Sequence, residues 1–86
     1  MFKDIELQGG DLMPFDYSKL EGLVKEKCRT RMNFAKEMGL SERSISLKMN
    51  GKVQWKQSEI CKACTILQID NANIPEYFFN LEVQLH

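Results

Sequence analysis

The stretch FAKEMGLSERSISLKMNGK, residues 34–52, decides the fold of this chain. It begins with the apolar spacing of a short helix, which ends at Gly39 because glycine readily adopts the positive φ of a sharp turn. Ser41 then supplies a side-chain oxygen of the kind that caps a new helix. The pattern predicts two short helices, residues 31–38 and 42–49, joined by a tight turn.

The second of these helices has only a narrow apolar face. Ile45 and Met49 lie four residues apart on one side, whereas serines and basic residues fill most other positions. A helix that enters the major groove of DNA needs an apolar back and a slim front that can form hydrogen bonds. Two such helices around a glycine-containing turn are typical of a helix-turn-helix.

Three further helices are expected around this pair. One runs over residues 16–27 from Asp16 as N-cap, one over residues 57–68, and a short one from Pro75 through Phe79. Strand-like alternation is confined to the two ends of the chain. We therefore expect a compact all-α domain of five helices, whose core residues are Leu20, Leu23, Val24, Phe34, Ala35, Met38, Ile45, Met49, Ile60, Ala63, Cys64 and Leu67. Gly22 is expected to mark a close approach inside the first helix.

The chain is expected to divide into residues 1–12, an N-terminal extension; residues 13–80, the domain; and residues 81–86, a tail. The paired glycines in QGGDLM can be encoded by the purine-rich motif that bacterial ribosomes bind before a start codon, which makes Met13 a candidate for the native start. The alternative is a genuine arm whose alternation pairs with the tail as a strand.

The distribution of charge favours a polyanionic partner although the net charge is zero. Residues 25–62 carry ten Lys or Arg against four Glu, a net +6, whereas residues 1–24 and residues 63–86 each carry net −3. A local positive field matters more to a polyanion than the total charge does.

Nothing in the sequence indicates an enzyme, a cofactor, a metal site or a small-molecule substrate. There is no phosphate-binding glycine loop, and the one histidine is His86. Cys61 and Cys64 lie inside a predicted helix rather than at its N-terminus, and they lack the further ligands of a zinc site, so core packing is favoured. No apolar run approaches a membrane span, and no signal peptide is evident, so a cytoplasmic protein is expected.

Residues 14–80 resemble the lambda-repressor-like DNA-binding domains of phage Cro and repressor proteins. The matching residues are Phe34 and Ala35, the turn GLS at 39–41, SIS at 44–46, and NGK at 50–52. The segments FDYSKLEG, GLSERSISLKMN and WKQSEI are similar to a narrower group of small Cro-like phage and prophage proteins. The resemblance implies a transcription regulator, associated with the nucleoid of a bacterial host, that binds a near-palindromic double-stranded operator as a homodimer.

The resemblance also implies which residues touch DNA. The second helix of the motif would read base edges through Glu42, Arg43, Ser44 and Leu47. Phosphate contacts are expected from Arg31, Ser41, Ser46, Lys48, Asn50, Lys52 and Lys56. Three positions have an alternative. Arg43 contacts a guanine or a phosphate, Leu47 contacts a thymine methyl or the core, and the stem of Lys48 covers core where many relatives have an apolar residue. Trp55 stacks on a sugar or, more commonly for an aromatic residue, anchors its loop.

Three adjacent aromatic residues, Tyr77, Phe78 and Phe79, are predicted to form the dimer interface, because a small core cannot receive all three. An alternative function remains open: a protein-interaction module, such as an antirepressor or antitoxin-like partner, that kept the fold without binding DNA. The positive middle of the chain favours DNA over this alternative.

Overall fold

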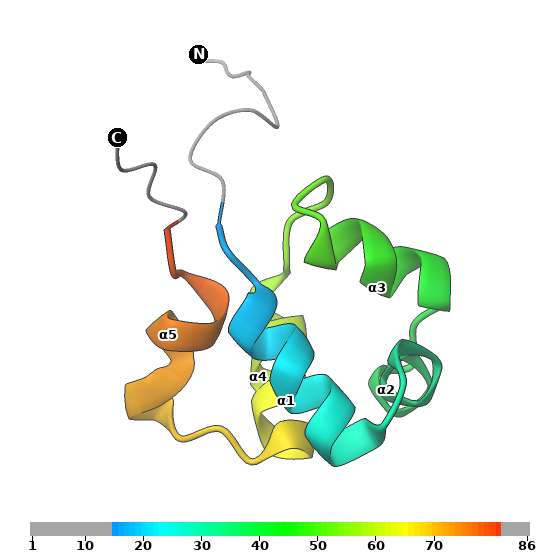
Figure 1. Ribbon diagram of the computed structural model, residues 1–86, viewed down its shortest axis with the longest axis horizontal. Helices are drawn as coiled ribbons and strands as arrows, with labels where there is room; N and C mark the ends of the chain where they lie inside the picture. The colour runs from blue at the N-terminus through cyan, green and yellow to red at the C-terminus, as the bar shows by residue number, and fades with distance from the viewer. Residues whose placement is uncertain (1–14, 82–86) are drawn as a thin grey trace.

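Five α-helices succeed one another within residues 15–81, the part of the chain that this computed structural model describes (Figure 1). They are α1 (Ser18–Cys28), α2 (Arg31–Met38), α3 (Glu42–Met49), α4 (Gln57–Leu67) and α5 (Ile74–Phe78), with a 3-10 turn, Asn71–Asn73, before the last. The predicted all-α, five-helix fold is confirmed. The predictions for residues 1–12 and Met13, and most of the predicted tail, fall outside the described residues.

The helix-turn-helix pair has the predicted bounds because its start and stop signals are local. The Thr30 hydroxyl accepts a hydrogen bond from the Asn33 N–H at 3.0 Å, and the Ser41 hydroxyl accepts one from the Ser44 N–H at 3.1 Å. These bonds satisfy backbone donors that have no partner within the first turn of each helix. Between the helices, Gly39 has a φ of 74°, the left-handed conformation that glycine tolerates.

The start of α1 differs from the prediction by two residues. Asp16 precedes the helix, and its carboxylate accepts the N–H of Ser18 at 2.9 Å. Hydrogen bonding from the Ser18 side chain, and second from this backbone N–H, lowers the pKa of Asp16 below its ordinary value. The expectation of close packing at Gly22 is wrong, since this residue is exposed and a Cβ there would meet no atom within 4 Å.

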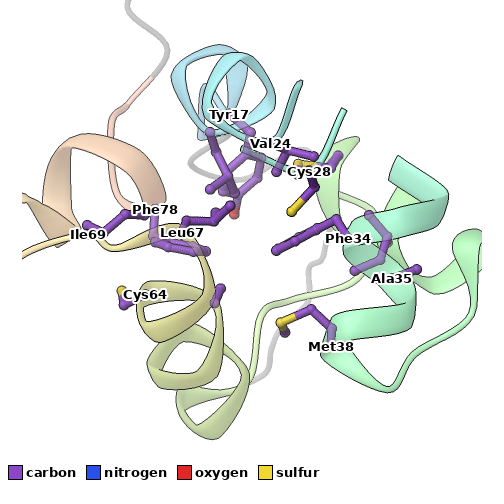
Figure 2. Packing of buried hydrophobic residues seen from close by; sticks show 14 residues of the cluster. Tyr17, Val24, Cys28, Phe34, Ala35, Met38, Cys64, Leu67, Ile69 and Phe78 are labelled. Carbon is purple, nitrogen blue, oxygen red and sulfur yellow. The ribbon is translucent and has the colours of Figure 1, made fainter. Parts of the chain in front are cut away.

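The core lies among α1, α2, α4 and α5 (Figure 2). Ile45 and Met49 of α3 also belong to it. Its largest side chains exposed by less than 2% are Phe34, Phe78, Leu20, Ile45, Leu67 and Val24. Burying each such side chain contributes about 1.5–3 kcal/mol. The predicted core is confirmed except at Leu23 and Ile60, which pack against it while half-buried.

The two ends of the described chain pair with each other. Phe15 and Leu81 form an isolated antiparallel bridge, and the Asp16 N–H donates to the Asn80 carbonyl at 2.6 Å. The Phe15 ring meets the Phe79 ring edge-on, with 5.8 Å between centroids. Leu81, predicted as the first residue of the tail, is therefore attached to the domain. None of the helices within residues 15–81 has the length and apolar character needed to cross a membrane.

Candidate nucleic-acid interface

Helix α3 lies at the edge of the molecule, on the side away from α5 (Figure 1). Glu42 and Arg43 are exposed in its first turn, whereas Ile45 is fully buried against the core. Ser44 and Leu47 are half-buried between these two faces. The helix therefore presents a charged N-terminal half to solvent and an apolar back to the domain.

Arg31, the first residue of α2, is held between two other helices. Its Nη1 donates to the hydroxyl of Ser46 on α3 at 3.1 Å, and its Nη2 lies 2.8 Å from a carboxylate oxygen of Glu21 on α1. The side chains of Arg31 and Glu21 are 31% and 33% exposed. The contact with Glu21 was not predicted, because no local sequence signal relates two helices that meet only through packing.

Lys48 is not placed as predicted, because its side chain is only 5% exposed and lies on the core side of α3. Its ammonium is 2.9 Å from a carboxylate oxygen of Glu59, donates to the Gln54 carbonyl at 3.1 Å, and lies 5.9 Å from the centre of the Trp55 ring. The expected phosphate contact is therefore replaced by the other alternative, in which the Lys48 stem covers the core. Its position next to buried Met49 and three residues after Ile45 turns it inward.

Glu59 connects this buried lysine to the start of α4. The same carboxylate oxygen accepts the N–H of Lys56 at 2.9 Å, so it also caps the helix. Burial by itself raises the pKa of Glu59, but the hydrogen bonds from Lys56 and Lys48 and the charges of both lysines outweigh it, and the net effect lowers that pKa. Sequence reasoning missed Glu59, although its place as the third residue of α4, three after the N-cap Lys56, is a local capping signal.

Beyond α3 the chain turns at Asn50 and Gly51, where Gly51 has a φ of 76°. The turn is closed by the Lys52 N–H, which donates to the Leu47 carbonyl at 2.9 Å. Asn50, Lys52 and Lys56 are all exposed. The structure thus leaves these three predicted phosphate contacts open to solvent.

Trp55 anchors the loop between α3 and α4, which agrees with the more common of its two expected roles. Its ring meets the Phe78 ring edge-on at 5.3 Å between centroids, and the Tyr17 ring lies 6.5 Å away. Its buried indole N–H has no hydrogen-bond partner within the described chain. A ring packed in this way holds the end of the loop against the core.

The predicted core packing is confirmed for Cys64 but is wrong for Cys61, which is exposed on α4. Cys28 and Cys64 are buried, Cys61 is exposed, and all three are free thiols. Burial, with a smaller contribution from Cys61, raises the pKa of Cys64, which makes its thiol less reactive. Residues 15–81 contain no group of three or more His, Cys, Asp or Glu side chains arranged to hold a metal ion.

The three aromatic residues of the predicted dimer interface separate in the structure. Phe78 is not placed as predicted, because it is 1% exposed and belongs to the core, where Trp55 packs on it. Tyr77 is half-buried, whereas Phe79 is 49% exposed. Phe79 borders an open, mostly apolar pocket of about 440 Å³ between α4 and α5, lined also by Trp55, Gln57, Ile60, Cys61 and Ile74.

Comparison with known proteins relates this fold to a phage regulator. The chain is similar to the modulator of repression (MOR) of the temperate bacteriophage TP901-1 from Lactococcus lactis, known from its solution structure. The two share 54% sequence identity and superpose with a TM-score of 0.70, over 84% of this chain and 97% of that one. This likeness confirms the predicted resemblance to small phage helix-turn-helix regulators and relates the chain to a regulatory protein rather than an enzyme.

No curated protein matches the chain. A family model described as "Protein of unknown function (DUF739)" matches residues 13–81. That match spans most of the chain and covers every helix of the structure. The chain therefore belongs to the DUF739 family.

Proposed function

We propose that this chain is a sequence-specific DNA-binding transcription regulator of the phage Cro or repressor type, which reads the major groove with α3. The observation that carries the proposal is the exposure of Glu42 and Arg43 in the first turn of the second helix of a helix-turn-helix. In this motif the N-terminal residues of the second helix reach base edges, while the first helix crosses the backbone.

Each residue of the reading face has a chemistry that suits a base edge. The guanidinium of Arg43 can donate two hydrogen bonds to a guanine, and the carboxylate of Glu42 can accept one from a cytosine amino group. The Ser44 hydroxyl suits either a donor or an acceptor, and half-buried Leu47 suits a thymine methyl. Short serines beside these groups leave room for the helix to enter the groove.

Phosphate contacts around this face would fix the orientation of the domain on DNA. We assign them to Arg31, Ser41, Ser46, Asn50, Lys52 and Lys56, and we leave out Lys48 because it is buried against Glu59. The hydroxyls of Ser41 and Ser46 already accept hydrogen bonds within the chain. Ser46 also has a proton to donate to a phosphate oxygen, whereas the Ser41 hydroxyl, which donates to the Ser44 hydroxyl at 3.1 Å, must turn away from it to do so.

We further propose that the protein acts as a homodimer on a near-palindromic operator in the cytoplasm of a bacterial host, in association with nucleoid DNA. The similar protein is a modulator of repression in a temperate bacteriophage, and phage transcription takes place in the host. Exposed Phe79 and the pocket beside it support a partner surface at α5.

Selection of bound sites from a random pool of DNA duplexes tests the proposal. The full chain should enrich one motif with two related half-sites, and its affinity should fall steeply as the salt concentration rises, because phosphate contacts release counterions. Failure to enrich any motif, together with no retention on heparin at low salt, would overturn it.

A second candidate function is a protein-interaction module that lacks DNA binding. The apolar pocket between α4 and α5 favours it, because exposed apolar surface of this kind suits a protein partner. The two functions predict different results for Arg43→Ala in a transcription reporter. A DNA reader loses regulation with this variant, whereas a module acting through α5 keeps it.

A further inference from the structure

The guanidinium of Arg31 is already bound by a carboxylate from its own chain. We propose that Glu21 is a built-in competitor for DNA phosphate at Arg31, so that it weakens the hold of the protein on DNA of any sequence. This inference deepens the proposed function and rests on it, since it concerns the strength of binding at the same interface.

The geometry places the competing group where a phosphate oxygen would bind. Arg31 begins α2, and the Ser46 hydroxyl on α3 receives its Nη1 at 3.1 Å, which fixes one edge of the guanidinium beside the reading helix. The other terminal nitrogen, Nη2, lies 2.8 Å from the Glu21 carboxylate. Carboxylate and phosphate oxygens are equivalent acceptors for a guanidinium, so a phosphate contact through Nη2 displaces or shares Glu21.

Glu21 opposes DNA binding in two ways. Arg31 gives up part of an existing ion pair when it turns to a phosphate, so the net gain from that contact is smaller. The carboxylate also remains close to the incoming phosphate. Two negative charges that bind the same guanidinium lie closer together than the screening length at moderate salt, so they repel each other. Because both side chains are about one-third exposed, solvent screens these effects, and a moderate change in affinity is expected rather than a large one.

The test compares Glu21→Gln with Glu26→Gln, which removes the same charge from the same helix. Glu26 is exposed and lies about 140° further around α1 than Glu21, away from the Arg31 contact. Each full-length variant is titrated against a fluorescently labelled duplex of random sequence, over a series of salt concentrations. Circular dichroism and thermal unfolding confirm that each variant is folded.

Glu21→Gln should bind the random duplex about fivefold more tightly than Glu26→Gln, which corresponds to about 1 kcal/mol. Its plot of log affinity against log salt should also steepen by up to about 0.9, because Arg31 then neutralises a phosphate instead of a carboxylate. The gain in affinity should disappear when Arg31 is also replaced, so the double variant Glu21→Gln, Arg31→Gln should bind the duplex no more tightly than Arg31→Gln alone. A change in fold stability alone would not move the salt slope.

Two results would overturn the competition while leaving the proposed function intact. The first is equal affinity and slope for Glu21→Gln and Glu26→Gln. The second is weaker binding by Glu21→Gln, which would mean that Glu21 orients Arg31 for phosphate. If neither the wild type nor any variant binds the duplex at low salt, the proposed function itself is overturned, and the competition with it.

Discussion

Arg43 is the residue whose loss should reveal base reading. If Arg43 reads a guanine, as we propose, Arg43→Ala should lower affinity for the selected operator by about 1–3 kcal/mol and relax the preference at one base position, because a bidentate contact would be lost. Lys52→Ala should instead weaken all duplexes about equally and reduce the salt slope by about one. Site selection repeated with each variant distinguishes these outcomes. An unchanged motif with Arg43→Ala would show that α3 meets DNA through other residues.

Lys48 and Glu59 form the most buried ion pair of the described chain, so the two partners should respond differently to substitution. Lys48→Met keeps the apolar stem but leaves the Glu59 carboxylate without its counter-charge. Because this carboxylate is 14% exposed and still accepts the Lys56 N–H, we expect a smaller loss of unfolding free energy than for Glu59→Gln. Glu59→Gln leaves the buried ammonium without its counter-charge and should cost about 3 kcal/mol. Urea unfolding measures both. Equal losses for the two variants would show that the pair itself, rather than the buried charge, stabilises the fold.

The pH dependence of stability tests the same ion pair, Lys48 and Glu59. Because folding lowers the pKa of Glu59 from its ordinary value of 4.5, its contribution to stability is present above that pH and is lost as the pH falls through the folded value. The difference in stability between the wild type and Glu59→Gln should therefore narrow between about pH 6 and about pH 3. A difference that stays constant over this interval would mean that folding leaves the pKa of Glu59 unchanged.

Two glycine-to-alanine substitutions test whether the positive φ at Gly39, between α2 and α3, requires a glycine. Gly39→Ala should destabilise the domain by about 1 kcal/mol, because an alanine at φ 74° is strained although its Cβ would approach only Lys62 Nζ, at 3.7 Å. Gly22→Ala, exposed in the middle of α1 with no atom near its Cβ, should stabilise it by about 0.5–1 kcal/mol. Thermal unfolding measures whether each substitution lowers or raises the stability of the domain. Similar effects of the two changes would mean that the backbone conformation at Gly39 does not set the cost.

The same elements show what could be predicted from sequence. The bounds of α2 and α3 were predicted to the residue, because Thr30, Gly39 and Ser41 act on backbone groups within a few positions. The predicted exposure of Glu42, Arg43, Asn50, Lys52 and Lys56 also agrees with the structure. Contacts between helices could not be predicted in this way. The inward turn of Lys48, which the sequence offered only as an alternative, and the pairing of Arg31 with Glu21 depend on how helices rotate against one another. Periodicity over two turns does not determine that rotation.

At the scale of the whole molecule, we predict a two-fold dimer formed through α5. Phe79 and Leu81 are 49% and 44% exposed, and Phe79 borders the apolar pocket, so a second copy can bury them. Phe79→Ser should weaken dimerisation in sedimentation velocity, whereas Met32→Ser, which alters an equally exposed residue on α2, should not. On DNA the two half-sites should lie about 34 Å apart. A wild type that sediments as a monomer, both free and on its operator, would exclude this dimer.

The domain should not need its first twelve residues. The family match begins at Met13, and residues 1–12 carry net −2, with Lys3 against Asp4, Glu6 and Asp11. A protein of residues 13–86 should unfold within about 0.5 kcal/mol of the full chain and bind DNA at least as well. Urea unfolding and duplex titration measure this, and mass spectrometry of the natively expressed protein identifies the start. A clear loss of stability or of dimerisation would show that the removed segment is structural.

The bridge between Phe15 and Leu81 also determines how the domain would respond to mechanical force. The pairing is antiparallel, so the chain enters at Phe15 and leaves at Leu81 on the same side of the pair. Tension applied to the two ends would peel the two segments apart at this bridge, rather than load it in shear. The tension would next act on α1 and α5, the helices beside the bridge, which pack together. A tether at either end, such as a fusion partner under drag, would therefore act on α1 and α5 first, and so on the dimer surface that we propose.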